Sequence, residues 1–466
     1  MNKTEKLIRN SGIYLIANFA SKFLNVILVP IYTAYLQTDD FGSVNLLLLL
    51  SGVIGILFSL DITDAAYRFL LDDNADKKKI ISNAIMIYWG GAIIFALVYF
   101  PFVISAGIKY GVILGFHIIL TNFQVLQQQM ARGMKCNKIY ASAGVVMCLV
   151  QGISNIAMIV WFHIGSVSIL IAPLIASVVT IIYVNAGTGI WKQVRIQEVE
   201  WKQIRALGAY GAPIGACTLF NWVISNSGTY LLTWITGTAA LSGVYALATK
   251  FPAFISAFTA IFGLAWQETA VEEYGSEEYI IYYNKVLNKY FTYNFYAMAL
   301  LLPMISSYFI LVDTKGYASA KLIVPLLLLS SIMESMKAYV ITGYYIVKRT
   351  KEISFNAFVS GMVTILLGVI LIRQFGLIGL AVSVLTGQAV HFLITYFRVR
   401  KHVAYKVELK KLGIPFLVVL LSTSVYYFDN IEVQIGMFVL LGVLVAFRER
   451  ALVQMLLRKL KVIKGR

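Results

Sequence analysis

Residues 135–195 read KCNKIYASAGVVMCLVQGISNIAMIVWFHIGSVSILIAPLIASVVTIIYVNAGTGIWKQVR. This stretch holds two apolar runs, 141–162 and 166–186, joined by a gap without Lys or Arg and flanked by basic residues on both outer sides. Each run has about the 20 residues that an α-helix needs to cross about 30 Å of hydrocarbon. The pattern therefore predicts a pair of membrane-spanning helices whose basic ends lie on the same side of the membrane.

The same alternation runs along the whole chain. Of the 39 Lys and Arg residues, 32 lie at the chain ends or in or beside alternate gaps, and the opposite gaps hold only Lys109, Lys315 and Arg373. Because cytoplasmic loops retain basic residues, both termini are expected to be cytoplasmic. The 14 expected spans are 11–36, 41–61, 81–103, 109–131, 141–162, 166–186, 206–234, 239–265, 287–311, 318–343, 354–372, 377–397, 412–428 and 432–447.

Composition supports an all-α polytopic membrane protein. Of 466 residues, 59% are hydrophobic and 13% are charged, which is too apolar for an ordinary soluble domain. The net charge of +17 lies in short loops beside spans, where anionic lipid accounts for it, so no nucleic-acid partner is expected. Three cysteines form neither a disulfide framework nor a metal-ligand spacing, and no bound metal or cofactor is expected.

Glycines recur in corresponding places of two halves, at offsets that rise from 196 to 211. An even number of spans per repeat predicts two parallel six-helix lobes around a central cavity, with two further C-terminal helices. The expected regions are an N-terminal lobe (1–190), a cytoplasmic linker (191–205), a C-terminal lobe (206–400) and the last two spans with a basic tail (401–466). The linker is either one amphipathic interfacial helix or a solvated segment with Trp anchors. The paired glycines are Gly12 with Gly208, Gly42 with Gly243, Gly133 with Gly343, and Gly165 with Gly376.

Two lysines lie deep inside spans. Lys22, in span 1, has Asn18 and Asn25 on its helix face, and Lys250 lies at comparable depth in span 8. An uncompensated Lys at the bilayer centre costs about 2.5–3.5 kcal/mol on insertion scales. The position of each lysine inside a span therefore requires an explanation. Either both await an external anion, or they snorkel or pair with a carboxylate of another span such as Glu334.

Span 4 carries a polar stripe at steps of three and four residues. Gln124 and Gln128 suit sugar hydroxyls or a hydrated wall, although interhelical hydrogen bonds are an alternative use. His117, with His391, is a candidate for a proton-coupled cycle or for a simple hydrogen bond. The stripe consists of His117, Thr121, Gln124, Gln128 and Arg132.

Two further charged groups are candidates for gating. At the cytoplasmic end of span 2, Asp61, Asp64 and Arg68 lie at i, i+3 and i+7. Either Asp64 and Arg68 form a local ion pair, or the group makes a gate contact. In span 10, Glu334 and Lys337 lie at i and i+3 and can pair with each other.

An enzyme is not expected. The acidic pair Asp39 and Asp40 lies in a short outward turn with nothing to hold a sugar donor, and no Gly-rich phosphate loop ending in Lys-Ser/Thr is present. Transport fits the pattern better.

Three stretches resemble bacterial polysaccharide-biosynthesis flippases, in the superfamily that also contains the multidrug and toxin extrusion antiporters. The first is 18–46, with Ser21-Lys22, Pro30 and Asp40-Phe41-Gly42. The second is the end of span 2, from Asp61 to Arg68-Phe69. The third is Gly243-x-Tyr245-x-x-Ala248-x-Lys250 in span 8. With the 14 spans, the resemblance covers nearly the whole chain.

The resemblance implies a flippase of the bacterial cytoplasmic membrane. Its cargo would be an undecaprenyl-pyrophosphate-linked oligosaccharide for O-antigen or capsule, carried from the inner to the outer leaflet by alternating access, with H⁺ or Na⁺ as coupling ion and a polysaccharide polymerase as partner. The lipid II flippase branch lines its cavity with arginines, whereas the central cations here are lysines, which argues against that cargo. The implied substrate-binding set is Lys22, Lys250, Asn18, Asn25, Gln124, Gln128 and Arg68, and the implied gating set is Asp61, Asp64, Glu334, Lys337 and His117.

Two other functions stay open. A drug or cation antiporter would be expected to have an acidic, aromatic cavity in place of a basic one. A scaffold of a polysaccharide synthase complex would carry nothing across the membrane.

Overall fold

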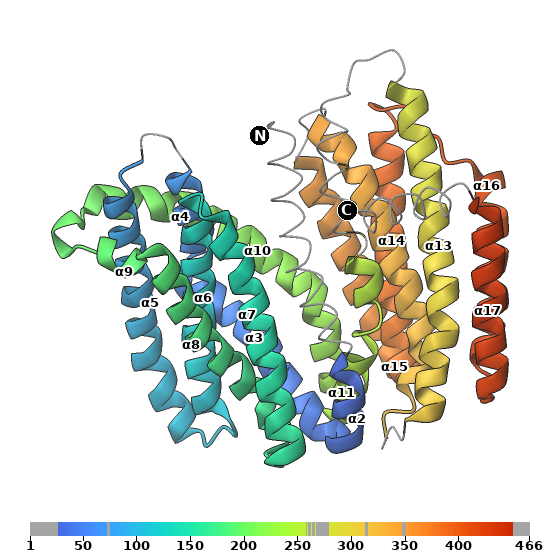
Figure 1. Cartoon of the computed structure of the whole chain (residues 1–466), viewed down its shortest axis with the longest axis horizontal. Coiled ribbons are helices and arrows are strands. Elements are labelled where there is room, and N and C mark those ends of the chain that lie inside the picture. Colours follow the sequence, from blue (N-terminus) through green and yellow to red (C-terminus); the bar gives the residue numbers. More distant parts are fainter. Residues whose placement is uncertain are drawn as a thin grey trace, which may run out of the picture. The chain divides into compact units, whose positions relative to one another are not determined.

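The computed structural model describes residues 27–71, 75–257, 279–312, 316–346 and 351–450, with Thr259, Phe262 and Trp266. All regular secondary structure in these ranges is helical, which confirms the all-α prediction (Figure 1). The chain divides into two compact units, Met1–Lys250 and Phe251–Arg466. The predicted lobes instead divide at 191–205, and that boundary stays a prediction.

The first unit contains short and long helices in sequence order. Segment η1 is π-helical, and η2 and η3 are single 3₁₀ turns. The elements are α2 (Val29–Tyr35), α3 (Thr38–Ser59), α4 (Ile62–Leu70), α5 (Lys77–Ser105), α6 (Gly111–Gly133), α7 (Asn137–Ile156), η1 (Ala157–Trp161), η2 (Gly165–Val167), α8 (Ser168–Thr188), α9 (Ile190–Gln193), η3 (Ile196–Glu198), α10 (Trp201–Thr236) and α11 (Ala240–Ala248).

The second unit contains helices α13 to α17, each of at least 18 residues. One of them, α15, contains spans 11 and 12, and the chain reverses at Gly376, whose φ of 53° and ψ of −122° are not helical. Glycine adopts this left-handed region without the steric cost that a Cβ would add. The elements are α13 (Tyr279–Leu311), α14 (Ala320–Ile346), α15 (Lys351–Val399), α16 (Leu409–Tyr426) and α17 (Ile431–Arg448).

Each expected span overlaps at least one of these helices. Eight helical stretches within the described ranges are long and apolar enough to cross a membrane. Contacts between loops also follow the predicted alternation of sides. Lys79 Nζ lies 2.6 Å from Glu200, both in gaps predicted to be cytoplasmic, and Lys109 Nζ lies 3.4 Å from Asp40, both in outward gaps.

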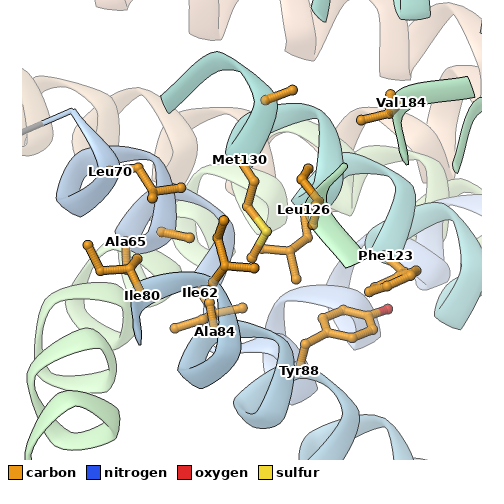
Figure 2. Packing of buried hydrophobic residues seen from close by; sticks show 14 of the residues in the cluster. Ile62, Ala65, Leu70, Ile80, Ala84, Tyr88, Phe123, Leu126, Met130 and Val184 are labelled. Atoms are coloured by element: carbon orange, nitrogen blue, oxygen red, sulfur yellow. The ribbon is translucent and has the colours of Figure 1, made fainter. Parts of the chain in front are cut away.

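The core of the first unit lies where α4, α5 and α6 meet (Figure 2). Ile62, Ala84 and Leu126 are fully buried there, and the Tyr88 and Phe123 rings pack with centroids 5.3 Å apart. Small residues such as Ala84 let membrane helices approach closely, and van der Waals contact then holds them together.

The core of the second unit is aromatic. The Tyr339 ring lies 4.6 Å from Trp266 and 5.5 Å from Tyr290, measured between centroids. Its hydroxyl donates to the Tyr283 carbonyl at 3.0 Å, so the buried polar atom is satisfied.

The linker between the predicted lobes does not form a single interfacial helix. It runs as the single turn α9, an extended stretch, the 3₁₀ turn η3 and a second extended stretch before α10 begins at Trp201. Asn83 of α5 holds it: Nδ2 donates to the Glu198 carbonyl at 2.9 Å, and Oδ1 accepts from the Glu200 amide at 2.9 Å. Because these bonds satisfy extended backbone at a buried side chain, the segment needs no helix of its own.

The second unit repeats this arrangement. Asn288 of α13 donates to the Lys406 carbonyl at 3.1 Å and accepts from the Glu408 amide at 2.8 Å, so the chain after span 12 is held as the chain after span 6 is. Asn83 and Asn288 are offset by 205 and their backbone partners by 208, between the glycine offsets of 201 and 210. The internal repeat is therefore visible in hydrogen bonds as well as in glycine spacing. Span 13 follows the second repeat as span 7 follows the first.

Candidate functional site

Span 8 is discontinuous at its lysine. Helix α11 ends at Ala248, residues 249–252 form turns, and helix resumes after Pro252. Proline lacks an amide hydrogen and hinders the preceding turn, which explains why the helix breaks here. In transporters, broken helices near the middle of the membrane commonly form substrate or ion sites.

Lys250 lies within this break. Its backbone amide donates to the Leu247 carbonyl at 3.0 Å, and the residue is half-buried. Among the described residues no carboxylate or other hydrogen-bonding group contacts its Nζ. The C-terminal end of α11 carries a partial negative charge that favours a cation by about 0.3–1 kcal/mol. That dipole offsets only part of the cost of placing a charge inside the membrane. The predicted role of Lys250 as a contact for an external anion stays a prediction.

Lys22, the second cation predicted for the cavity, cannot be compared with Lys250. Lys22, Asn18 and Asn25 lie outside the described residues. Their substrate-binding role stays a prediction.

The end of span 2 is also broken, at Leu60 and Asp61, which both have positive φ. The Asp61 carboxylate accepts a hydrogen bond from the Thr218 hydroxyl of α10 at 3.2 Å. The break contacts α10 closely: a Cβ added to Gly211 would lie 2.7 Å from the Leu60 carbonyl oxygen. Glycine at this position lets two backbones approach as only small residues allow.

The two other charged groups of this region lie on α4. Asp64 and Arg68 are four residues apart on one helix face, and both are exposed. Their gating and substrate-binding roles stay predictions.

The polar stripe of span 4 lies mostly inside the first unit. His117 is buried, and its Nδ1 lies 3.3 Å from the Leu170 carbonyl of α8. Gln124 is 4% exposed and donates to Gln128 Oε1 at 2.6 Å. Of the two amides, Gln128 is the less buried and the better placed to meet a ligand.

The stripe ends in a cation held by aromatic rings. The Arg132 guanidinium lies 4.4 Å from the Tyr67 ring centroid and 5.6 Å from that of Tyr140. Such contacts contribute about 0.5–1 kcal/mol where exposed. Arg132 thus joins α4, α6 and α7.

The ends of spans 2 and 8 that are predicted to face outward cross at a reciprocal contact. A Cβ on Gly42 would lie 2.0 Å from the Ala239 carbonyl oxygen, and one on Gly243 would lie 2.1 Å from that of Thr38. Thr38 and Ala239 are offset by 201, as are the two glycines. Reciprocal contacts between equivalent residues are the mark of a twofold axis. These two contacts relate residues that the glycine offsets pair, as the predicted internal repeat would require.

In the second unit, Glu334 and Lys337 form the predicted pair, with 4.0 Å between Oε1 and Nζ. The Lys337 side chain is 14% exposed and that of Glu334 is 54% exposed. His391 of α15 is buried, and its Nε2 has no hydrogen-bond partner among the described residues.

Sequence reasoning missed three of these features. The glycine crossing and the Asn83 and Asn288 anchors had a signal in the repeat offsets, but the offsets alone did not say which residues touch. The break in span 8 had a signal in Pro252, two residues beyond Lys250.

A sequence model described as polysaccharide biosynthesis protein matches residues 7–266. At the level of sequence, no match is found among functionally curated proteins. In structure, the chain is similar to the lipid II flippase MurJ in an inward closed conformation, with a TM-score of 0.64 and 15% identity over 94% of this chain and 99% of that one.

Multidrug transporters are about as similar. An inward-facing MATE family transporter of the MOP superfamily has a TM-score of 0.66 and 14% identity over 84% of this chain and 98% of that one. A variant of the Vibrio cholerae MATE transporter VcmN has a TM-score of 0.54 and 14% identity over 88% and 98%. At such identities the comparison shows a shared fold.

Proposed function

Because this chain belongs to the polysaccharide biosynthesis protein family and shares the fold of MurJ and MATE transporters, we propose that it is a lipid-linked oligosaccharide flippase. It moves an undecaprenyl-pyrophosphate-linked repeat unit from the inner to the outer leaflet of the bacterial cytoplasmic membrane. The product serves surface polysaccharide assembly, such as O-antigen or capsule.

The observation that carries the proposal is Lys250 in the break of span 8, which has no partner among the described residues. A pyrophosphate crosses hydrocarbon only if its charge is compensated, since charges cost several kcal/mol inside a membrane. A lysine that no described carboxylate holds supplies that compensation while the substrate is bound. Lys22 is proposed as the second cation.

Alternating access requires one end to be closed while the other is open. The glycine crossing of α3 and α11 supports a closed outward end, because two backbones in contact leave no passage between them. Opening it requires the two helices to separate, which small residues permit because no side chains interlock there. The carbohydrate would pass Gln128, and H⁺ or Na⁺ would drive the cycle.

The test is export in cells that lack the native gene. Lys250→Gln is expected to reduce surface polysaccharide at least about tenfold, because the loss of a buried charge-assisted contact corresponds to about 1.5–3 kcal/mol. Lys250→Arg should restore part of it. Lys321→Gln, which removes a cation that pairs with Asp429, should leave export unchanged.

The glycan-linked lipid should accumulate in the Lys250→Gln strain with normal levels of the protein. Wild-type export with this variant would exclude Lys250 as a substrate contact.

A MATE-like antiporter is the second candidate, since that fold matches equally well. It predicts that deletion of the gene sensitises cells to cationic drugs. The flippase predicts unchanged sensitivity, because a basic site repels cations.

A further inference from the structure

The second unit contains a cavity of about 640 Å³ between α13, α14, α15 and α16. Its wall is largely aromatic, with rings from Phe295, Phe392, Phe397 and Phe416. Among the described residues that line it, Arg400, which follows α15, is the charged one. The volume lies within the range of about 300–1,000 Å³ typical of small-molecule sites.

The cavity extends along the last turns of span 12. Phe392 and Arg400 are eight residues apart, which corresponds to about 12 Å along a helix. One leaflet of a bilayer has about 15 Å of hydrocarbon. The cavity therefore runs from the predicted cytoplasmic headgroup level through most of one leaflet.

The mouth of the cavity is apolar and accessible. Leu393, Phe397 and Phe416 line it and are 46%, 58% and 46% exposed. Side chains of this kind on a membrane span face acyl chains. The Tyr396 hydroxyl accepts from the Val407 amide at 3.2 Å, so the loop beside the cavity is fixed by α15 itself.

Charge at the cytoplasmic end is strongly one-sided. Residues 398–411 contain six Lys and Arg but only one carboxylate, Glu408, which pairs with Lys411 at 2.9 Å. Arg398 is held by Asn356 at 3.1 Å and by the Phe355 ring. For Arg400, no carboxylate partner is found within the described ranges.

We propose that this cavity binds an anionic phospholipid of the inner leaflet. Arg400 binds the phosphate of the headgroup, and one acyl chain lies along Phe397 and Phe392. Basic pockets between spans on the cytoplasmic side bind such headgroups in membrane proteins generally. The depth of one leaflet fits an acyl chain, whereas a polyprenyl carrier is longer than a leaflet. The bound lipid joins α16 to α13, α14 and α15 within the second unit, independently of the transported substrate.

Gly413 gives a direct test. It lines the cavity, and a Cβ added there meets no atom within 4 Å, so Gly413→Leu fills the space without a clash at Cβ. Gly436→Leu in α17 is the matched control, since its Cβ also meets nothing within 4 Å and the helix-propensity change is the same. Purified full-length protein is titrated with phosphatidylglycerol or phosphatidylcholine, and binding is followed by native mass spectrometry and by the unfolding midpoint.

Wild type and Gly436→Leu should retain phosphatidylglycerol and gain thermal stability from it, and Gly413→Leu should do neither. Arg400→Gln should lower the preference for phosphatidylglycerol over phosphatidylcholine roughly fivefold, as expected for one cation at an anionic surface. Lys401→Gln, in the same loop but outside the cavity wall, is its control. Equal retention by Gly413→Leu and wild type, or displacement of phosphatidylglycerol by undecaprenyl phosphate at equal concentration, would overturn the proposal.

Discussion

At the scale of single residues, two charged groups define the site in opposite ways. Lys250 has no partner among the described residues, whereas Asp61 is fixed by Thr218. A charge that is free in the resting protein can meet a ligand, and one that is already bonded stabilises a conformation. We therefore propose a binding role for Lys250 and a role in conformational control for Asp61.

The contact of Asp61 can be removed without changing shape. Thr218→Val keeps the branched side chain but loses the donor, and it is expected to lower the free energy of unfolding by about 1 kcal/mol, as for a partly exposed hydrogen bond. Thr423→Val in α16 is the control, because among the described residues that hydroxyl donates to Val419 of its own helix. Chemical or thermal unfolding in detergent measures the change in the free energy of unfolding for both variants. Equal effects would mean that the Asp61 contact contributes nothing specific.

The sequence predicted that Lys250 lies inside span 8, either awaiting an external anion or paired with a carboxylate of another span such as Glu334. It could not predict that α11 ends at Ala248, because a single proline is also compatible with a kink in a continuous helix. Likewise, the spacing of His117 and Gln124 predicted a polar face, but only folding shows that this face is buried against protein. Periodicity predicts which side chains share one face of a helix. It does not predict whether that face meets water, lipid or another helix.

At the scale of elements, repeats and glycines explain how the helices meet. Gly243 of α11 contacts the start of α3 and Gly211 of α10 contacts its end, so α3 is held near both ends by close backbone approach. Such contacts depend on the absence of a side chain, and they separate without breaking an interlocked surface. This is what a gate helix needs.

A single substitution of a glycine at this crossing by a residue with a side chain should therefore prevent the outward end from closing. Gly243→Val would place its Cβ 2.1 Å from the Thr38 carbonyl oxygen, so the crossing cannot form. We expect increased labelling from outside of a cysteine placed at Thr38, with loss of export. Gly208→Val, whose Cβ meets nothing within 4 Å, should change neither. Unchanged labelling in the Gly243 variant would argue against a gate at this crossing.

The linker anchors offer an independent test of the repeat. Asn83→Leu and Asn288→Leu each remove two hydrogen bonds to extended backbone, so each should destabilise its own unit by about 2 kcal/mol or more. Ser424→Ala, which loses only a bond within α16, is the control. Proteolysis near residues 197 and 406 would report release of each segment. An effect in one variant alone would contradict equivalent roles.

At the scale of the whole molecule, the alternation of basic loops predicted the order of helices correctly, because the bilayer imposes helix length and loop charge directly on sequence. The boundary between the lobes was predicted at 191–205 from the glycine repeats, and it stays a prediction. The compact units divide elsewhere, after Lys250. The charge of a loop does not tell which helices pack together. Locating the lobe boundary therefore requires evidence of another kind.

The central claim is that the protein carries an anionic lipid-linked glycan across the bilayer through a site at Lys250. Reconstitution of purified protein into vesicles with a labelled undecaprenyl-pyrophosphate oligosaccharide tests it most directly, with accessibility of the glycan to an external glycosidase as readout. We expect wild-type protein and Lys321→Gln to move the lipid between leaflets and Lys250→Gln to fail. Movement by Lys250→Gln at the wild-type rate, or transport of a cationic dye in place of the glycan lipid, would contradict the account.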